Sequence, residues 1–218
     1  QQKTAELNYL RSQINPHFIY NTLELIRGIA TDYDTPQIGQ LTVSMGKILR
    51  YSIKGEPIVP LQQEIDITLA YLHIQQARFP NRFTILTNFQ PDTTQIPVLK
   101  MLLQPLVENA IFHGLEPKEG NGIIFLNSTL TGKFLKITIR DNGVGISEKK
   151  LSRIQYSLAS PIYDTSQNIG LVNTNARIRL QYGSEYGISL ESTEGDGTCV
   201  TLQLPSGKQT KKQTKNQD

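Results

Sequence analysis

The stretch DNGVGIS, Asp141 to Ser147, follows an alternating apolar run, KFLKITIR, and predicts a strand that ends in a glycine-containing loop. Gly143 and Gly145 would let the backbone approach a flat ligand closely, and the Asp141 carboxylate can accept a hydrogen bond from an exocyclic amine. Asp-Asn and Asn-Gly pairs also favour ordinary turns. Alone, the stretch is therefore only moderately specific for a binding site.

A polar pair lies upstream in PLVENAIFHG, residues 105–114, where the sequence predicts a buried helix. An unpaired buried amide costs roughly 2–7 kcal/mol, so Glu108 and Asn109 need partners. A bound magnesium ion with its water would satisfy both side chains, and so would a polar cap or an internal hydrogen bond. His113 lies one turn after Asn109 and could meet a phosphate, although a single histidine is more often structural.

Two further stretches lie downstream. Gly170 opens a helix directly after a polar loop, so that free backbone N–H groups face whatever lies before it, as in anion sites. GDGT, residues 195–198, predicts a tight hairpin before the last strand. Each of these stretches is ordinary in isolation, but their order along the chain is specific.

That order resembles the ATP-binding (GHKL) fold shared by DNA gyrase, Hsp90, MutL and histidine kinases, over about Leu61 to Pro205. The resemblance implies ATP and Mg²⁺ as cofactors, with magnesium on Asn109 and with Glu108 polarising the reacting groups. It places Asp141 on the adenine amino group, and the loop Glu148 to Asn168 as a lid. The other nucleotide-binding residues that it implies are His113, Gly143, Gly145, Gly170, Leu171, Asn173 and Thr198. The family usually has glycine where Asn168 stands.

The front of the chain distinguishes among these relatives. QINPHFIYNTLELI, residues 13–26, closely resembles the phosphoacceptor segment of YesM/LytS-type sensor histidine kinases. The resemblance implies that His17 receives phosphate and that Asn21, one turn on, orients its imidazole. Neutral imidazole is a competent nucleophile at physiological pH. Without the surrounding motif, an ordinary helix histidine would be the better interpretation of His17.

Apolar spacing predicts two amphipathic helices at the front, over residues 6–30 and 37–53. A hairpin of two such helices buries too little surface alone, so we expect a homodimeric four-helix bundle. Lys54 to Pro60 carries one Gly and two Pro residues, which mark a domain boundary. We therefore expect a phosphotransfer domain over residues 1–55, an ATP-binding domain over 56–205 and a disordered basic tail over 206–218.

Behind the boundary, helices are expected over 61–79, 100–117 and 170–183, a strand over 83–89, and hairpins around Thr131–Gly132 and around GDG. Helices that come first and hairpins that come late favour α+β over a doubly wound parallel sheet. The predicted architecture is a dimerising helical hairpin followed by an α/β sandwich.

Composition removes several function classes. Hydrophobic residues make up 38% of the chain and no apolar run of about 18 residues occurs, so a soluble fold is expected. The single Cys199 excludes an internal disulfide or a cysteine-based zinc cage. The net charge of +3 belongs to the last eleven residues, which carry four lysines and one aspartate. The body is neutral, so nucleic acid is not an expected partner.

The resulting hypothesis is the cytoplasmic core of a plasma-membrane sensor histidine kinase, with the sensor preceding Gln1. It would phosphorylate its own histidine from ATP and pass the phosphate to a response-regulator receiver domain. This fragment would make no direct membrane contact. The alternative is an ATP-driven clamp of the Hsp90 or MutL sort, which would not need the NPHF segment.

Overall fold

The computed structural model describes residues 22, 25–26, 36–53, 55–159 and 169–207. Thr22, Leu25 and Ile26 are helical. The rest of the expected helix over 6–30, including His17 and Asn21, lies outside the described residues, as do Asn168 and the lysine-rich tail. The expectations for those positions stay predictions.

The described chain contains both helices and strands. The helices are α3 (Pro36–Ile53), α4 (Leu61–Arg78), α5 (Gln104–Asn109), α6 (Glu148–Ala159) and α7 (Ile169–Tyr182), with a 3₁₀ turn η1 (Pro91–Thr93) and a π-helical turn η2 (Ala110–Leu115). The strands are β1 (Ile58–Pro60), β2 (Phe83–Phe89), β3 (Pro97–Leu99), β4 (Gly122–Thr131), β5 (Phe134–Asp141), β6 (Gly187–Thr193) and β7 (Gly197–Pro205). The expected α+β class is confirmed.

One sheet carries the fold, in the strand order β2-β4-β5-β7-β6. The two predicted hairpins, β4–β5 and β6–β7, are antiparallel, and β2 joins the edge parallel to β4. Such a parallel pair requires a crossover connection, here the segment through β3, α5 and η2. The register sets Asp141 of β5 opposite Thr198 of β7.

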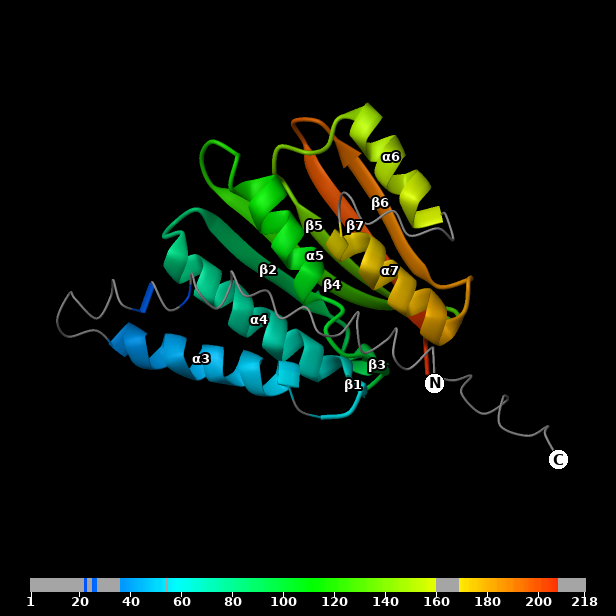
Figure 1. Ribbon diagram of the computed structural model, residues 1–218, viewed down its shortest axis with the longest axis horizontal. Coiled ribbons are helices and arrows are strands. Elements are labelled where there is room, and N and C mark those ends of the chain that lie inside the picture. The colour runs from blue at the N-terminus through cyan, green and yellow to red at the C-terminus, as the bar shows by residue number, and fades with distance from the viewer. Residues whose placement is uncertain (1–21, 23–24, 27–35, 54, 160–168, 208–218) are drawn as a thin grey trace.

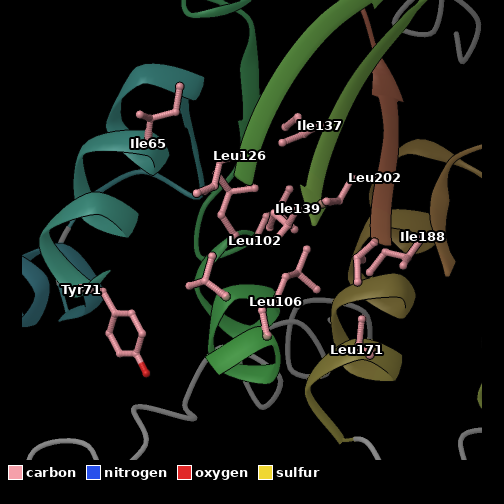
Figure 2. Packing of buried hydrophobic residues seen from close by; sticks show 14 of the residues in the cluster. Ile65, Tyr71, Leu102, Leu106, Leu126, Ile137, Ile139, Leu171, Ile188 and Leu202 are labelled. Carbon is pink, nitrogen blue, oxygen red and sulfur yellow. The ribbon is translucent and has the colours of Figure 1, made fainter. Parts of the chain in front are cut away.

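Helices cover one face of this sheet, and Figure 1 shows α4, α5 and α7 side by side on it, with α3 alongside α4. Alternate residues of each strand face the helices, as the period of two requires. Figure 2 shows Leu126, Ile137, Ile139 and Leu202 of the sheet facing Leu106 and Leu171 of the helices and Leu102 of the turn before α5. The opposite face presents mostly partly buried or exposed polar side chains, such as Lys136, Thr138 and Arg140 of β5.

The apolar stripe of α3 is covered within a single chain. Leu41, Met45 and Ile48 belong to the common core, and α3 packs against α4. This corrects the surface argument for the dimer, because these three side chains need no partner chain to exclude water. The predicted dimer therefore depends on the segment before α3.

Two local expectations were wrong. The segment from Glu148 was expected as a loop, but Glu148–Ala159 forms α6, because Leu151, Ile154 and Leu158 make an apolar stripe that packs on the core. The helix expected from Lys100 begins only at Gln104, since Met101 has φ of 59°, a left-handed conformation that interrupts a helix.

Candidate functional site

The Asp141 carboxylate lies at the floor of the site, at the end of β5. It is 3% exposed and accepts a hydrogen bond of 2.8 Å from the backbone N–H of Gly143. Burial raises the pKa of Asp141 from 3.8 to about 6, although backbone hydrogen bonds from Gly143 and Thr198 oppose the shift. A buried acceptor that keeps few protein partners can accept from a ligand.

Glycines bring the backbone against this carboxylate. A Cβ at Gly114 would lie 2.6 Å from Oδ1 of Asp141, and a Cβ at Gly143 would lie 2.3 Å from the carbonyl of Gly114. Gly145 has φ of 68°, and its Cβ would lie 2.0 Å from the carbonyl oxygen of Thr193. Real Cβ atoms do not approach so closely, so each of these positions needs glycine.

The loop after β5 is held by backbone and hydroxyl hydrogen bonds. Val144 donates its N–H to the carbonyl of Gly114 at 3.0 Å, which joins the loop to η2. Ile146 donates its N–H to the hydroxyl of Ser192 at 3.0 Å, and that hydroxyl lies 2.9 Å from Thr198 Oγ1. Thr198 is thus fixed beside Asp141 by both strand register and side-chain contact.

Asn109 and Glu108 end α5 where the backbone widens into η2. The N–H of Glu116 bonds to the carbonyl of Ile111 at 2.8 Å, the five-residue step of a π-helix, which is common at functional sites. The Asn109 side-chain nitrogen is buried and has no hydrogen-bond partner among the described residues. Burial raises the pKa of Glu108, and a 3.1 Å hydrogen bond from Gln104 partly offsets the shift.

These elements enclose a cavity of about 60 Å³ beside Asp141. It is lined by Leu106, Asn109, Ala110, His113, Gly114, Ile139, Asp141, Gly145, Ile146, Lys150, Ile154, Leu171, Leu190, Thr198 and Val200. A larger groove of about 1270 Å³ runs between α3 and α4. Its described lining holds no lysine, arginine, aspartate or glutamate and lies away from Asp141, so the smaller cavity is the better ligand site.

The structure therefore brings together six of the expected residues, Asn109, His113, Asp141, Gly145, Leu171 and Thr198, around one cavity. Gly143 packs behind it, and Gly170 lies next to Asn109, its ideal Cβ 3.6 Å from the side-chain nitrogen. Glu108 and Asn173 do not line the cavity.

Sequence reasoning missed Gly114 and Lys150. Gly114 stands in the FHG segment at the end of η2, and only its contact with Asp141 shows why it is glycine. Lys150 reaches the cavity from α6, an element that was expected as loop. The apolar spacing of α6 was the signal that could have found it.

Comparison with known proteins accords with this geometry. Residues 94–208 match the family model described as histidine kinase-, DNA gyrase B-, and HSP90-like ATPase, and residues 5–83 match the histidine kinase model. The chain belongs to the histidine kinase family. The match to the histidine kinase model runs to residue 83, past the expected boundary at 55, so the domain limits stay a prediction.

Among curated histidine kinases, the chain is 36% identical over 204 residues to the sensor histidine kinase YesM of Bacillus subtilis (strain 168). It is 33% identical over 205 residues to the sensor histidine kinase YpdA of Escherichia coli (strain K12). Each match covers 93% of this chain but 34% of the relative, so the chain spans about a third of their length.

Solved histidine kinases share the fold. The histidine kinase domain of the blue-light activated histidine kinase from Erythrobacter litoralis superposes with a TM-score of 0.52 at 15% identity, covering 95% of this chain and 94% of that one. The catalytic domain of histidine kinase ThkA superposes with a TM-score of 0.51 at 18% identity, and the match covers 68% of this chain and 96% of that one. Among the described helices of this chain, none is long and apolar enough to cross a membrane.

Proposed function

We propose that this chain is the catalytic core of a sensor histidine kinase, which transfers the γ-phosphoryl group of ATP to His17 and then to a response-regulator aspartate. The observation that supports it most is the buried Asp141 carboxylate, held by glycines at the floor of an apolar cavity in a member of this family. The relatives above are all kinases and give the clamp alternative no support.

In this proposal the cavity takes the adenine ring. Asp141 accepts from the adenine amino group, Thr198 supports that end, and Ile139 and Leu171 contact the ring faces. At about 60 Å³ the cavity is far smaller than the about 150 Å³ that admits benzene. Nucleotide entry therefore requires the residues that line the cavity to move apart.

The phosphates would lie toward the end of α5. Asn109 fits a magnesium–phosphate complex, because its buried side-chain nitrogen, which has no hydrogen-bond partner from the described chain, can donate to a phosphate oxygen, and its amide oxygen is a ligand type that magnesium takes. Magnesium usually takes one or two protein ligands and keeps phosphate oxygens and waters, so the lack of a three-ligand acidic cluster among the described residues is compatible with it. Bound there, it would neutralise the charge on the transferred group. His113 and the α7 residues Gly170 and Asn173 would contact the phosphates.

The transfer step breaks the bond between the γ-phosphorus and its bridging oxygen and releases ADP. A P–N bond forms at the unprotonated ring nitrogen of His17, and the N–H proton of the other ring nitrogen passes to solvent. Glu108, whose raised pKa reflects its burial, would polarise the groups at the end of α5, and Asn21 would orient the imidazole. The roles of His17 and Asn21 are inferred from the NPHFIYN motif alone.

The partners follow from the same proposal. A second copy of the chain pairs with the front helices, and a receiver domain takes the phosphate. The relatives are sensor proteins about three times as long as this chain. The resemblance to sensor histidine kinases leads us to propose that this core lies on the cytoplasmic side of a membrane sensor, with the signal-binding part outside this sequence.

Incubation with γ-labelled ATP and Mg²⁺ tests the proposal. Label that is acid-labile and alkali-stable, present on the wild type and absent from His17→Ala, is expected. Nucleotide affinity in His17→Ala should stay within about threefold, since the histidine does not bind ATP. Label that persists on His17→Ala would overturn the assignment.

A further inference from the structure

The turn Lys100–Leu103 lies between β3 and α5. We call α5 the nucleotide helix, because it carries Asn109, and this turn is where it contacts the other helices. Met101 in this turn has φ of 59°, which a non-glycine residue rarely adopts without support. Its neighbours in sequence are buried, so their backbone groups need partners inside the protein. The side-chain partners come from two different helices, α4 and α7.

Glu64 of α4 satisfies the N–H groups of this turn. Its side chain is 2% exposed and accepts from the N–H of Met101 at 2.6 Å, of Leu102 at 2.8 Å and of Leu103 at 3.2 Å. α5 has no side-chain cap of its own at Leu103. Glu64 therefore satisfies, from a separate helix, the N–H groups of the turn that leads into α5.

α7 holds the other side of the same turn. Arg177 is 5% exposed and donates to the carbonyl oxygen of Met101 at 2.9 Å and also to that of Lys100. The turn is thus fixed between a carboxylate on α4 and a guanidinium on α7. Charged hydrogen bonds of this kind are stronger than neutral ones.

Tyr51, in the last turn of α3, joins this arrangement. Its hydroxyl donates to Glu64 Oε1 at 2.5 Å, and the ammonium of Lys100 lies 4.5 Å from the centre of its ring. Burial, then the Glu64 carboxylate, raises the pKa of Tyr51 well above its usual range, so the hydroxyl keeps its proton and stays a donor. One carboxylate therefore holds α3 and the start of α5 together.

We propose that Glu64 and Tyr51 are positioning residues that couple the front helices to the nucleotide helix α5. This inference rests on the proposed function, because α3 follows the segment that carries His17. Glu64 fixes the end of α5 opposite Asn109, and Tyr51 ties that end to α3. A shift of α3 relative to α4 would break the Tyr51–Glu64 hydrogen bond and separate α3 from the turn before α5.

Hydrogen exchange on the full chain tests the coupling without any activity. Glu64→Gln keeps the shape but cannot accept every bond, so protection should fall at residues 101–103 and also at the end of α3, residues 48–53, by about tenfold. Asp66→Asn removes an exposed carboxylate from the same helix and is the matched control. Wild-type protection at 48–53 in Glu64→Gln would overturn the coupling.

Tyr51→Phe keeps the ring and leaves the Glu64 hydrogen bonds to residues 101–103 in place, but it removes the hydrogen bond between Tyr51 and Glu64. It provides a second test if the Glu64 variant fails to fold. Nucleotide KM should stay within about twofold while the rate of His17 labelling at saturating ATP falls about tenfold. Tyr156→Phe, at a side chain 76% exposed and outside the cavity lining, is the control.

The two readouts separate the possible failures. A Tyr51→Phe labelling rate within twofold of wild type, or a KM that rises in proportion to the loss of rate, would overturn the positioning role. If the wild type carries no label, the proposed function fails, and the exchange of residues 48–53 in Glu64→Gln still decides the coupling.

Discussion

Gly114 lies directly against the carboxylate of Asp141, close enough that a Cβ there would stand 2.6 Å from Oδ1. The contact joins the end of η2 to the end of β5, two segments that no local pattern relates. It fixes the one buried anion of the cavity between a helical turn and a glycine loop. A ligand amine can then reach this anion only from the cavity side.

Asp141→Asn should weaken ATP binding. The amide keeps the shape of the side chain but replaces an anionic acceptor, and a hydrogen bond to a charged group is worth roughly 1.5–3 kcal/mol, or about 10- to 150-fold in affinity. Calorimetric titration of the full chain measures it. An unchanged dissociation constant would place adenine elsewhere.

The same substitution should raise stability at neutral pH. The folded pKa of Asp141 is raised to about 6, so its contribution to stability is fully present below the unfolded value near 3.8 and is lost as pH rises through about 6. The free energy of unfolding of Asp141→Asn should therefore exceed that of the wild type by up to about 3 kcal/mol at pH 8 and equal it near pH 4. Urea unfolding at both values checks this, and a less stable variant at pH 8 contradicts it.

Gly143→Ala should unfold or distort the site, because its Cβ would meet the backbone of Gly114 at 2.3 Å. We expect a loss of about 3 kcal/mol or more, with ATP binding lost in parallel. Gly46→Ala in α3 is the matched control. No atom lies within 4 Å of its Cβ, so it should stabilise the helix by about 0.5–1 kcal/mol. Equal stability of the two variants would refute the close approach.

Asn109→Ala should lower the labelling rate at saturating ATP by about 100-fold, as expected for loss of a group that holds the metal on a transferring phosphoryl group. ATP affinity measured without Mg²⁺ should change little, and the gain in affinity on adding Mg²⁺ should disappear. Asn109→Asp, which keeps a metal ligand, should retain that gain. Full activity of Asn109→Ala would reject the metal role.

The dimer is predicted through the segment before α3, with micromolar or tighter affinity. Leu10→Asp combined with Ile14→Asp should give monomers in sedimentation equilibrium at tens of micromolar, while ATP binding is spared. Leu41→Asp is a contrasting variant, because Leu41 is 4% exposed within one chain and its replacement should lower folding stability instead. A monomeric wild type, with its helices intact, would contradict the dimer.

Local sequence determined most of the elements. Apolar spacing placed α3, α4, α7 and both hairpins, because a period of 3.6 or 2 depends only on neighbours in the chain. It also placed Asp141 at a strand end and Asn109 on a buried helix. It missed that α6 is a helix, although Leu151, Ile154 and Leu158 carry the signal.

Tertiary structure alone decided the rest. Three features join segments that lie far apart in the chain: the parallel pairing of β2 with β4, the contact of Gly114 with Asp141, and the hydrogen bonds from Tyr51 and Met101 to Glu64. Buried carboxylates and amides must find partners, but which partner each one meets depends on the order of strands and the packing of helices over them. In the sequence, Glu64 is one polar residue among several in α4. Only the packed fold shows that its carboxylate connects α3 with the turn before α5.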